Sequence, residues 1–154
     1  DFMALLQMRP DQPEESRAVE WVAYASNAFN TMVPFYANVE RTPEYLANTT
    51  GTVSTDNFYW TSRLIAAMAD ASYNKSLFHL ERYEEAVLSA GRALVNQYDA
   101  KLAAEPDTAR RAALREEANT AIAAMLQEKA ADTLDKVLFE LSSQMKNAYS
   151  RSDA

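Results

Sequence analysis

The sequence predicts an α+β fold in which a short antiparallel sheet of about three strands precedes long helices. Up to residue 36, aromatic and β-branched residues form short runs that prolines and polar clusters separate, a pattern typical of strands. After residue 56, apolar residues recur at three- and four-residue steps almost to the end of the chain, a pattern typical of helices.

Three strands are expected at the start of the chain. The first is the apolar run from Phe2 to Arg9, which two prolines close at residues 10–13. The second, from Ala18 to Ala25, and the third, from Thr31 to Tyr36, form a hairpin because the residues between them have turn chemistry. Pro34 cannot donate to a ladder, so it indicates an edge position, a bulge or the end of the third strand.

The next elements are predicted to be helical. Thr42-Pro43 opens one helical turn. A longer helix begins at Asp56 or Asn57 and runs to about Tyr73, and Asn74-Lys75-Ser76 makes a weak break after it.

Two long helices are then expected to form an antiparallel αα-hairpin over residues 77–149, joined near Pro106. The first carries a heptad seam at Leu80, Tyr83, Val87, Ala90, Leu94, Gln97 and Lys101. The second has neither proline nor glycine, and its apolar face is expected at Leu114, Ala118, Ile122, Met125, Leu134, Leu138, Leu141, Met145 and Ala148. Lys129 and Asp132 interrupt this face, so we expect either that contact with the partner helix lapses there or that the helix bends.

Composition excludes several classes of function. The 15 basic and 22 acidic residues give a net charge of −7, which repels phosphate backbones and anionic lipid, so neither nucleic acid nor membrane is an expected partner. The 154 residues contain no cysteine, hence no disulfide, no cysteine zinc site and no thiol nucleophile. Because the chain opens at Asp1 directly on a predicted strand, we expect it to be the C-terminal piece of a longer protein.

No catalytic, cofactor-binding or metal-binding residue is predicted. His79 is the single histidine and is expected to be a partly exposed residue near a helix start. Ser26, Ser54 and Ser62 are not expected to be nucleophiles, because no histidine accompanies them in a catalytic motif.

The acidic pairs Glu14-Glu15, Glu84-Glu85 and Glu116-Glu117 are expected to be solvated rather than catalytic. Adjacent residues on a helix point about 100° apart, so the two carboxylates of a pair would not meet at one substrate atom. Asn27, Asn30 and Asn38 fit either turns or a pocket lining.

Four segments carry a resemblance to a known family by their order and spacing: Leu6-Gln7-Met8-Arg9-Pro10, Glu20-Trp21-Val22-Ala23, Val33-Pro34-Phe35-Tyr36-Ala37 and Tyr59-Trp60-x-x-Arg63-Leu64. Together they resemble the C-terminal part of the dipeptidase A family. Its members are cysteine peptidases of the N-terminal-nucleophile hydrolase class, related to secernin and penicillin V acylase. The resemblance covers roughly residues 1 to 75.

This resemblance implies that residues 1–50 are strands of a truncated αββα sandwich and that residues 51–154 are a helical region. It implies cytoplasmic hydrolysis of small peptides by an N-terminal cysteine, without a metal or organic cofactor. That cysteine would lie in the missing N-terminal portion of the same protein, which is therefore the expected partner, and the piece alone would be inactive.

A different class of function stays open. The helices could form a non-enzymatic interaction or oligomerisation module, and a homo-oligomer is expected in either case. Removing a sheet from a sandwich should also leave apolar side chains partly exposed or buried by another copy. The residues concerned are Phe2, Leu5, Trp21, Val33 and Phe35.

Overall fold

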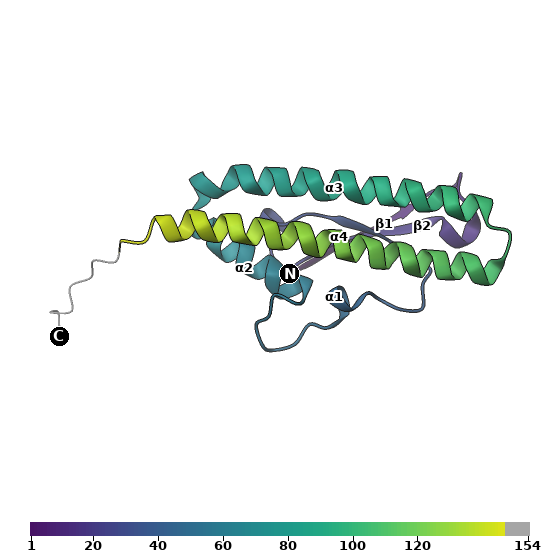
Figure 1. The fold of residues 1–154 in the computed structure, drawn as a ribbon, viewed down its shortest axis with the longest axis horizontal. Coiled ribbons are helices and arrows are strands. Elements are labelled where there is room, and N and C mark those ends of the chain that lie inside the picture. Colours follow the sequence, from purple (N-terminus) through teal and green to yellow (C-terminus); the bar gives the residue numbers. More distant parts are fainter. Residues whose placement is uncertain (147–154) are drawn as a thin grey trace.

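A computed structural model describes residues 1–146 of the chain, and it confirms the predicted α+β fold (Figure 1). The strands are β1 (Phe2–Met8), β2 (Ala18–Tyr24) and β3 (Val33–Tyr36), and the helices are α1 (Glu44–Ala47), α2 (Phe58–Ala71), α3 (Tyr73–Ala104) and α4 (Thr108–Ser143). Short 3₁₀ turns at Glu14–Ser16 and Asn27–Phe29 lie in the two connections between strands.

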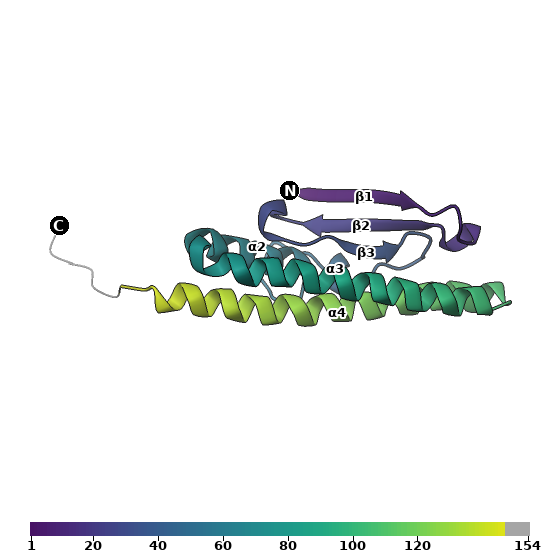
Figure 2. The same ribbon diagram turned by 90° about the horizontal axis from the view of Figure 1, so that it is seen from above.

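The three strands form one antiparallel sheet in the order β1-β2-β3, as predicted (Figure 2). Leu5 lies opposite Trp21, and Trp21 lies opposite Pro34, so these three side chains share one face of the sheet. Figure 2 shows β3 beside α3 and α4, whereas β1 lies on the side of the sheet farthest from them.

The outer edge of β3 is closed by side chains of α4. The amide N–H of Ala37 donates to Ala18 at 3.1 Å, so the alternation of an antiparallel ladder turns the backbone of Pro34 and Tyr36 away from β2. There Asn119 pairs with Tyr36 twice: its Oδ1 accepts from the backbone N–H at 2.8 Å, and its Nδ2 donates to the carbonyl at 3.0 Å. Asn119 therefore satisfies the strand edge as a neighbouring strand would.

The chain beyond β3 is held to α4 in the same way. The Arg115 guanidinium donates to the carbonyl of Asn38 at 2.9 Å. The Glu116 carboxylate accepts from the backbone N–H groups of Glu40 and Arg41 at 2.8 and 3.1 Å. Three side chains within about one turn of α4, those of Arg115, Glu116 and Asn119, thus bind the backbone from β3 to residue 41.

Pro34 rests directly on α3. A Cβ atom added to Gly91 would lie 2.8 Å from Cδ of Pro34, which is closer than van der Waals contact allows. Of the three alternatives predicted for Pro34, the edge position is the one found, because β3 is an outer strand of the sheet. Glycine at position 91 permits the close approach of strand and helix.

The helix starts agree with the predictions to within a few residues. Asn57 caps α2, since its Oδ1 accepts from the N–H of Trp60 at 2.9 Å, and Asp107 caps α4 through the N–H of Arg110 at 2.9 Å. The predicted break at residues 74–76 is wrong by a few positions, because the chain turns at Ser72. The Ser72 hydroxyl bonds the Met68 carbonyl at 2.7 Å, which favours a turn over a continued helix.

The seam of α3 follows the prediction only over its first turns. Its buried positions are Ser76, Leu80, Tyr83, Val87, Gly91, Val95, Tyr98 and Leu102. A strict heptad requires a supercoil, whereas the apolar face of a straight helix drifts by about 20° per heptad. Ala90 and Leu94 are therefore replaced at the seam by their C-terminal neighbours, and the predicted positions Gln97 and Lys101 are exposed.

The apolar face predicted for α4 is also wrong in the second half of the helix. The face that packs inward includes Ala118, Ile122, Leu126, Ala130, Thr133 and Val137, so contact does not lapse near Lys129 and Asp132. Leu138 and Met145 are instead 49% and 62% exposed. The helix ends at Ser143, and Ala148 and the predicted hairpin end at residue 149 lie outside the described residues.

The exposure predicted for the sheet is correct at β1 and wrong at β3. Phe2 and Leu5 are 60% and 54% exposed, and Trp21 is half-buried. Val33 and Phe35 are fully buried, because α3 and α4 of the same chain enclose β3. They belong to a core that the sheet shares with all four helices.

Replacing Leu126 by alanine should lower the free energy of unfolding by about 2–5 kcal/mol, since this side chain is completely buried and its removal leaves a cavity. Leu138→Ala, on the same helix but half exposed, should cost less than about 1 kcal/mol. Urea unfolding followed by circular dichroism measures both. Equal losses for the two variants would contradict the assigned faces of α4.

Asn119→Leu keeps the branched shape of the side chain but leaves the N–H and carbonyl of Tyr36 without partners. A buried group left unpaired costs about 1–3 kcal/mol, so this variant should be destabilised by at least that amount. Thr120→Ala, at the exposed neighbouring position, should change stability by about 0.5 kcal/mol or less. A loss no greater for Asn119→Leu than for this control would disprove the edge-closing role.

Candidate functional site

The structure keeps the polar residues considered from the sequence apart. His79 lies in the second turn of α3, and its Nε2 is 3.2 Å from the Glu140 carboxylate, which makes it a bridge between α3 and α4. The Ser54 hydroxyl bonds Asp56 at 3.0 Å, while Ser62 is buried in α2. None of these contacts joins a nucleophile to a base.

Two of the three acidic pairs, Glu14-Glu15 and Glu116-Glu117, contain a residue with a structural partner. Glu15 forms an ion pair with Arg111 at 2.8 Å, and Glu117 accepts from the Tyr98 hydroxyl at 2.8 Å. Glu84 and Glu85 are exposed on α3. Within residues 1–146, no group of three or more acidic, histidine or cysteine side chains could hold a metal ion.

Asn30 stabilises a turn, which is the first of the two alternatives predicted for it, turn or pocket lining. Its Nδ2 donates to the carbonyl of Tyr24, and its Oδ1 accepts from the N–H of Thr31 at 2.8 Å. These bonds tie the two ends of the connection between β2 and β3 together. Asn38 donates to the carbonyl of Glu15 at 3.3 Å, which is likewise a backbone contact.

A partly buried ionic cluster joins the sheet to α3. The Arg9 guanidinium reaches both carboxylate oxygens of Asp99, at 2.6 and 3.1 Å, and the Tyr36 hydroxyl donates to Asp99 at 2.7 Å. Burial and the bond to Asp99 raise the pKa of Tyr36 above its ordinary value, so the phenol stays a proton donor over the whole physiological range. Arg9 and Tyr36 together occupy both carboxylate oxygens of Asp99, whereas Nε of Arg9 is buried without a hydrogen-bond partner among the described residues. The cluster anchors the end of β1.

A hollow of about 330 Å³ lies at the opposite end of the sheet, between α2 and the start of the β2–β3 connection. Ala25 and Ser26 line one side, and Arg63 and Asp70 line the other. Ala25 has a φ angle of 67°, which is uncommon for a residue other than glycine. Backbone strain of this kind concentrates at functional sites, which makes this hollow the best-supported candidate site of the described residues.

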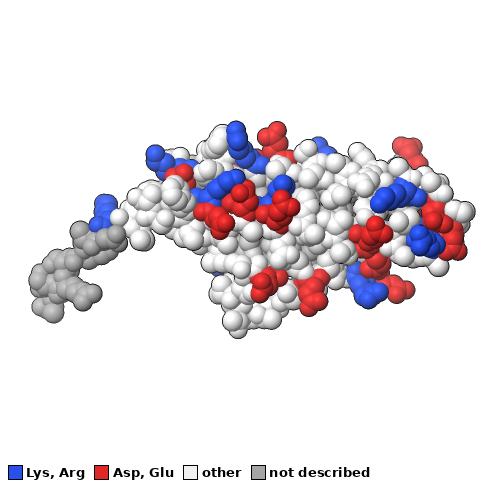
Figure 3. Space-filling model, in the orientation of Figure 1, with Lys and Arg blue, Asp and Glu red and all other residues white. Residues whose placement is uncertain are grey.

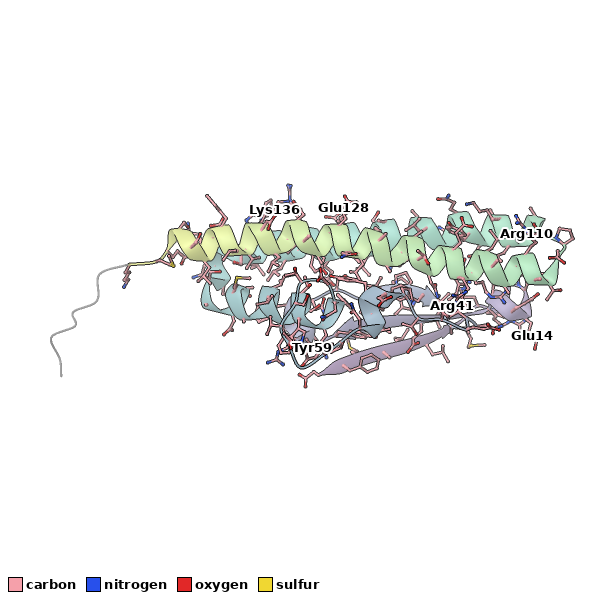
Figure 4. All side chains as sticks on the ribbon, turned by 60° about the horizontal axis from the view of Figure 1, so that its bottom comes forward. Glu14, Arg41, Tyr59, Arg110, Glu128 and Lys136 are labelled. Carbon is pink, nitrogen blue, oxygen red and sulfur yellow. The ribbon has the colours of Figure 1, made fainter. Side chains whose placement is uncertain are left out.

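Two aromatic rings hold the Arg63 side chain at this hollow. Its guanidinium lies 5.8 Å from the centre of the Tyr59 ring and 6.0 Å from that of Trp60. Trp60 is itself fixed, since its indole N–H donates to the carbonyl of Thr50 at 2.8 Å. Figure 4 shows Tyr59 on the side of α2 that is turned away from α4.

β1 presents an apolar surface on both of its faces. All seven of its residues are exposed, among them Leu6 and Met8 at 61% and 58%. Among the described residues, only β2 pairs with β1, so the other edge of β1 is unpaired. An exposed apolar strand with a free edge is a template for pairing with another strand.

Comparison with known proteins identifies the family. The family model described as peptidase family C69 matches residues 1–86, which cover the whole sheet and α2. The chain belongs to this family. Peptidase family C69 thus accounts for the four segments singled out in the sequence, and similarity to dipeptidase A proteins extends over most of the chain.

Relatives with dipeptidase names match both the sheet and the helices. The chain is 43% identical over 150 residues to a probable dipeptidase A of Streptococcus pyogenes, covering 97% of this chain and 31% of that protein. It is 35% identical over 188 aligned residues to a dipeptidase of Bifidobacterium longum, covering 98% of this chain and 35% of that protein. A dipeptidase A of Lactobacillus helveticus is 41% identical over 69 residues, 45% of this chain and 14% of that protein. The chain therefore spans about a third of the length of the relatives it matches most fully.

Sequence reasoning found the motif of Tyr59, Trp60 and Arg63 but not the hollow beside it. The hollow needs the β2–β3 connection to lie against α2, which no local pattern reveals. The pairing of Arg9 with Asp99 was also not predicted, because these two residues lie far apart in the chain.

Along α2–α4, no described helix is both long and apolar enough to cross a membrane.

Proposed function

We propose that the chain is the C-terminal part of a cytoplasmic dipeptidase that hydrolyses small peptides. The observation that carries the proposal is the similarity over 97% of the chain to a probable dipeptidase A of which it spans 31%. A peptidase role is consistent with the family, and the remaining two thirds of such a protein would supply what these residues lack.

The nucleophile is the main missing part. The resemblance implies attack on the peptide carbonyl by an N-terminal cysteine thiolate, loss of the amine, and release of the acyl group by water. This chain contains no cysteine, and its single histidine bridges two helices. The cysteine of the proposed enzyme therefore lies in a part of the protein that precedes residue 1.

The free edge of β1 supports this proposal. In the proposed whole enzyme, a strand from the preceding part would pair with β1, and a second layer would cover exposed side chains such as Leu5 and Leu6. The sheet would then continue into the sandwich that the resemblance implies.

A protein that joins this chain to its preceding coding sequence should release amino acids from a panel of dipeptides. Residues 1–154 alone should release none above background, because they contain no nucleophile with a base. Amino-acid release measured by chromatography tests both statements, with the full protein carrying alanine at its N-terminal cysteine as the inactive control. Turnover that copurifies with residues 1–154 alone would refute the assignment of the nucleophile.

Self-association is a second proposal, and it is compatible with the first. It is supported by a row of four apolar residues on α4: Leu134, Leu138, Leu141 and Met145. Leu134 is partly buried against the core, so the row begins at the border of the face that packs inward. The row's steps of four, three and four residues form a heptad seam, and Leu138 and Met145 are about half exposed or more. On the face shown in Figure 3, positive and negative side chains are mixed, so no large patch of one charge would repel a second copy there.

If the α4 seam joins two copies, Leu138→Glu should shift the full-length protein from dimer to monomer in sedimentation velocity at several concentrations. The desolvated charge would oppose association without touching the core, because Leu138 is half exposed. Lys136→Glu, at an exposed position two residues away, is the matched control and should leave the dimer intact. A wild-type protein that is monomeric at all concentrations would rule out this proposal.

A further inference from the structure

We infer that Arg63 binds the terminal carboxylate of the peptide substrate, in the hollow between α2 and the β2–β3 connection. The inference rests on the proposed dipeptidase function and adds a specificity-determining residue to it. Four observations lead to this inference. Two concern Arg63, namely its fixed side-chain conformation and its lack of a counter-ion among the described residues. The other two concern the hollow, namely its charges and its strained wall.

The side-chain conformation of Arg63 is held in place by contacts within the chain, without a bound ligand. Its guanidinium lies over the rings of Tyr59 and Trp60, and it donates to the Tyr59 hydroxyl at 3.4 Å. The two rings meet edge to face with centroids 5.2 Å apart, so they stabilise each other. A guanidinium held in place loses less rotamer entropy on binding than a free one, which raises its affinity for a carboxylate.

Arg63 has no carboxylate partner among residues 1–146. The ion pairs of the described chain involve other residues, including Arg9 with Asp99 and Arg111 with Glu15. Arg63 is exposed at the hollow, and its planar fork can form two parallel hydrogen bonds with one carboxylate. A carboxylate ligand would supply the missing counter-charge.

The hollow offers a charge for each end of an extended dipeptide. Its lining contains one guanidinium, that of Arg63, and two carboxylates, those of Asp1 and Asp70. Asp70 lies two turns further along α2 than Arg63, about 10 Å along the helix axis. A dipeptide is about 7 Å long and carries its carboxylate and its ammonium group at opposite ends. With the carboxylate on Arg63, the ammonium group points toward Asp70.

The volume of the hollow and the conformation of its wall are also suitable for binding a dipeptide. Its volume of about 330 Å³ falls within the range of about 300–1,000 Å³ usual for small-ligand sites. The wall opposite α2 contains Ala25, whose φ of 67° is held by the bond from its N–H to the Asp1 carbonyl at 2.9 Å and by the tie that Asn30 makes across the connection. A preorganised wall facing a preorganised guanidinium favours one ligand pose.

Recognition of the terminal carboxylate explains how an enzyme of this kind selects dipeptides. In a dipeptide, the scissile bond lies one residue from the carboxylate, so a cation at that distance favours the free acid over the amide. A carboxylate such as Asp70 that binds the ammonium group beyond the scissile bond then disfavours longer peptides. A site built for a charge rejects an analogue that lacks it, because its own charged group is left unpaired.

The test uses the full-length protein and two substrates, alanyl-alanine and its C-terminal amide. Wild type should prefer the acid over the amide in kcat/KM. Arg63→Gln should lose at least about tenfold in kcat/KM for the acid, mainly through KM, and should change the amide by less than about twofold. Arg63→Lys should restore part of the preference, since it keeps the charge and loses the fork.

Arg82→Gln is the matched control. Its guanidinium also stacks on an aromatic ring, 4.3 Å from the centre of Phe78, but it lies on α3 away from the hollow. This variant should keep the wild-type preference for the acid.

The outcomes separate the inference from the function on which it rests. If wild type hydrolyses neither substrate, the proposed dipeptidase function is wrong. If wild type is active and Arg63→Gln keeps the preference, the carboxylate site is wrong. If Arg63→Gln loses both substrates equally or loses its folded circular dichroism spectrum, Arg63 contacts the preceding part of the protein instead, and the inference is overturned.

Discussion

The arrangement of sheet and helices depends on the pairing of Asn119 with the backbone of Tyr36. A strand edge buried against a helix normally leaves polar groups unpaired, because a helix has no free backbone groups along its length. Asn119 supplies one donor and one acceptor at the right spacing, and Arg115 and Glu116 continue this arrangement along the following residues. The β3 edge can therefore enter the core, and α4 takes the place that a fourth strand would occupy.

The two edges of the sheet have opposite characters as a result. β3 is completely buried by the helices of its own chain, whereas β1 is exposed along its whole length. Phe2, Leu6 and Met8 lie exposed on an unpaired strand, which is a template for pairing with another strand. In the proposed enzyme, β1 is the edge at which the preceding part of the protein would join the sheet.

Local signals predicted the elements better than their faces. Prolines and turn residues placed three strands, and Asn57 and Pro106 marked two helix starts, because these effects act over a few residues. The seam of α3 drifted from the predicted heptad, since its direction is set by contact with Pro34 and α4. Asn119, Asp99 and the hollow at Arg63 could not be predicted, because each requires partners that only the folded chain brings together.

The contact between Pro34 and Gly91 links two positions that are remote in sequence. Because a Cβ atom at position 91 would lie 2.8 Å from the proline ring, a larger residue on α3 needs a smaller one on β3. Single changes at position 91 are thus blocked, and paired changes are permitted. These two positions should covary among peptidases that share this packing, and a loss of proline at one should release the glycine requirement at the other.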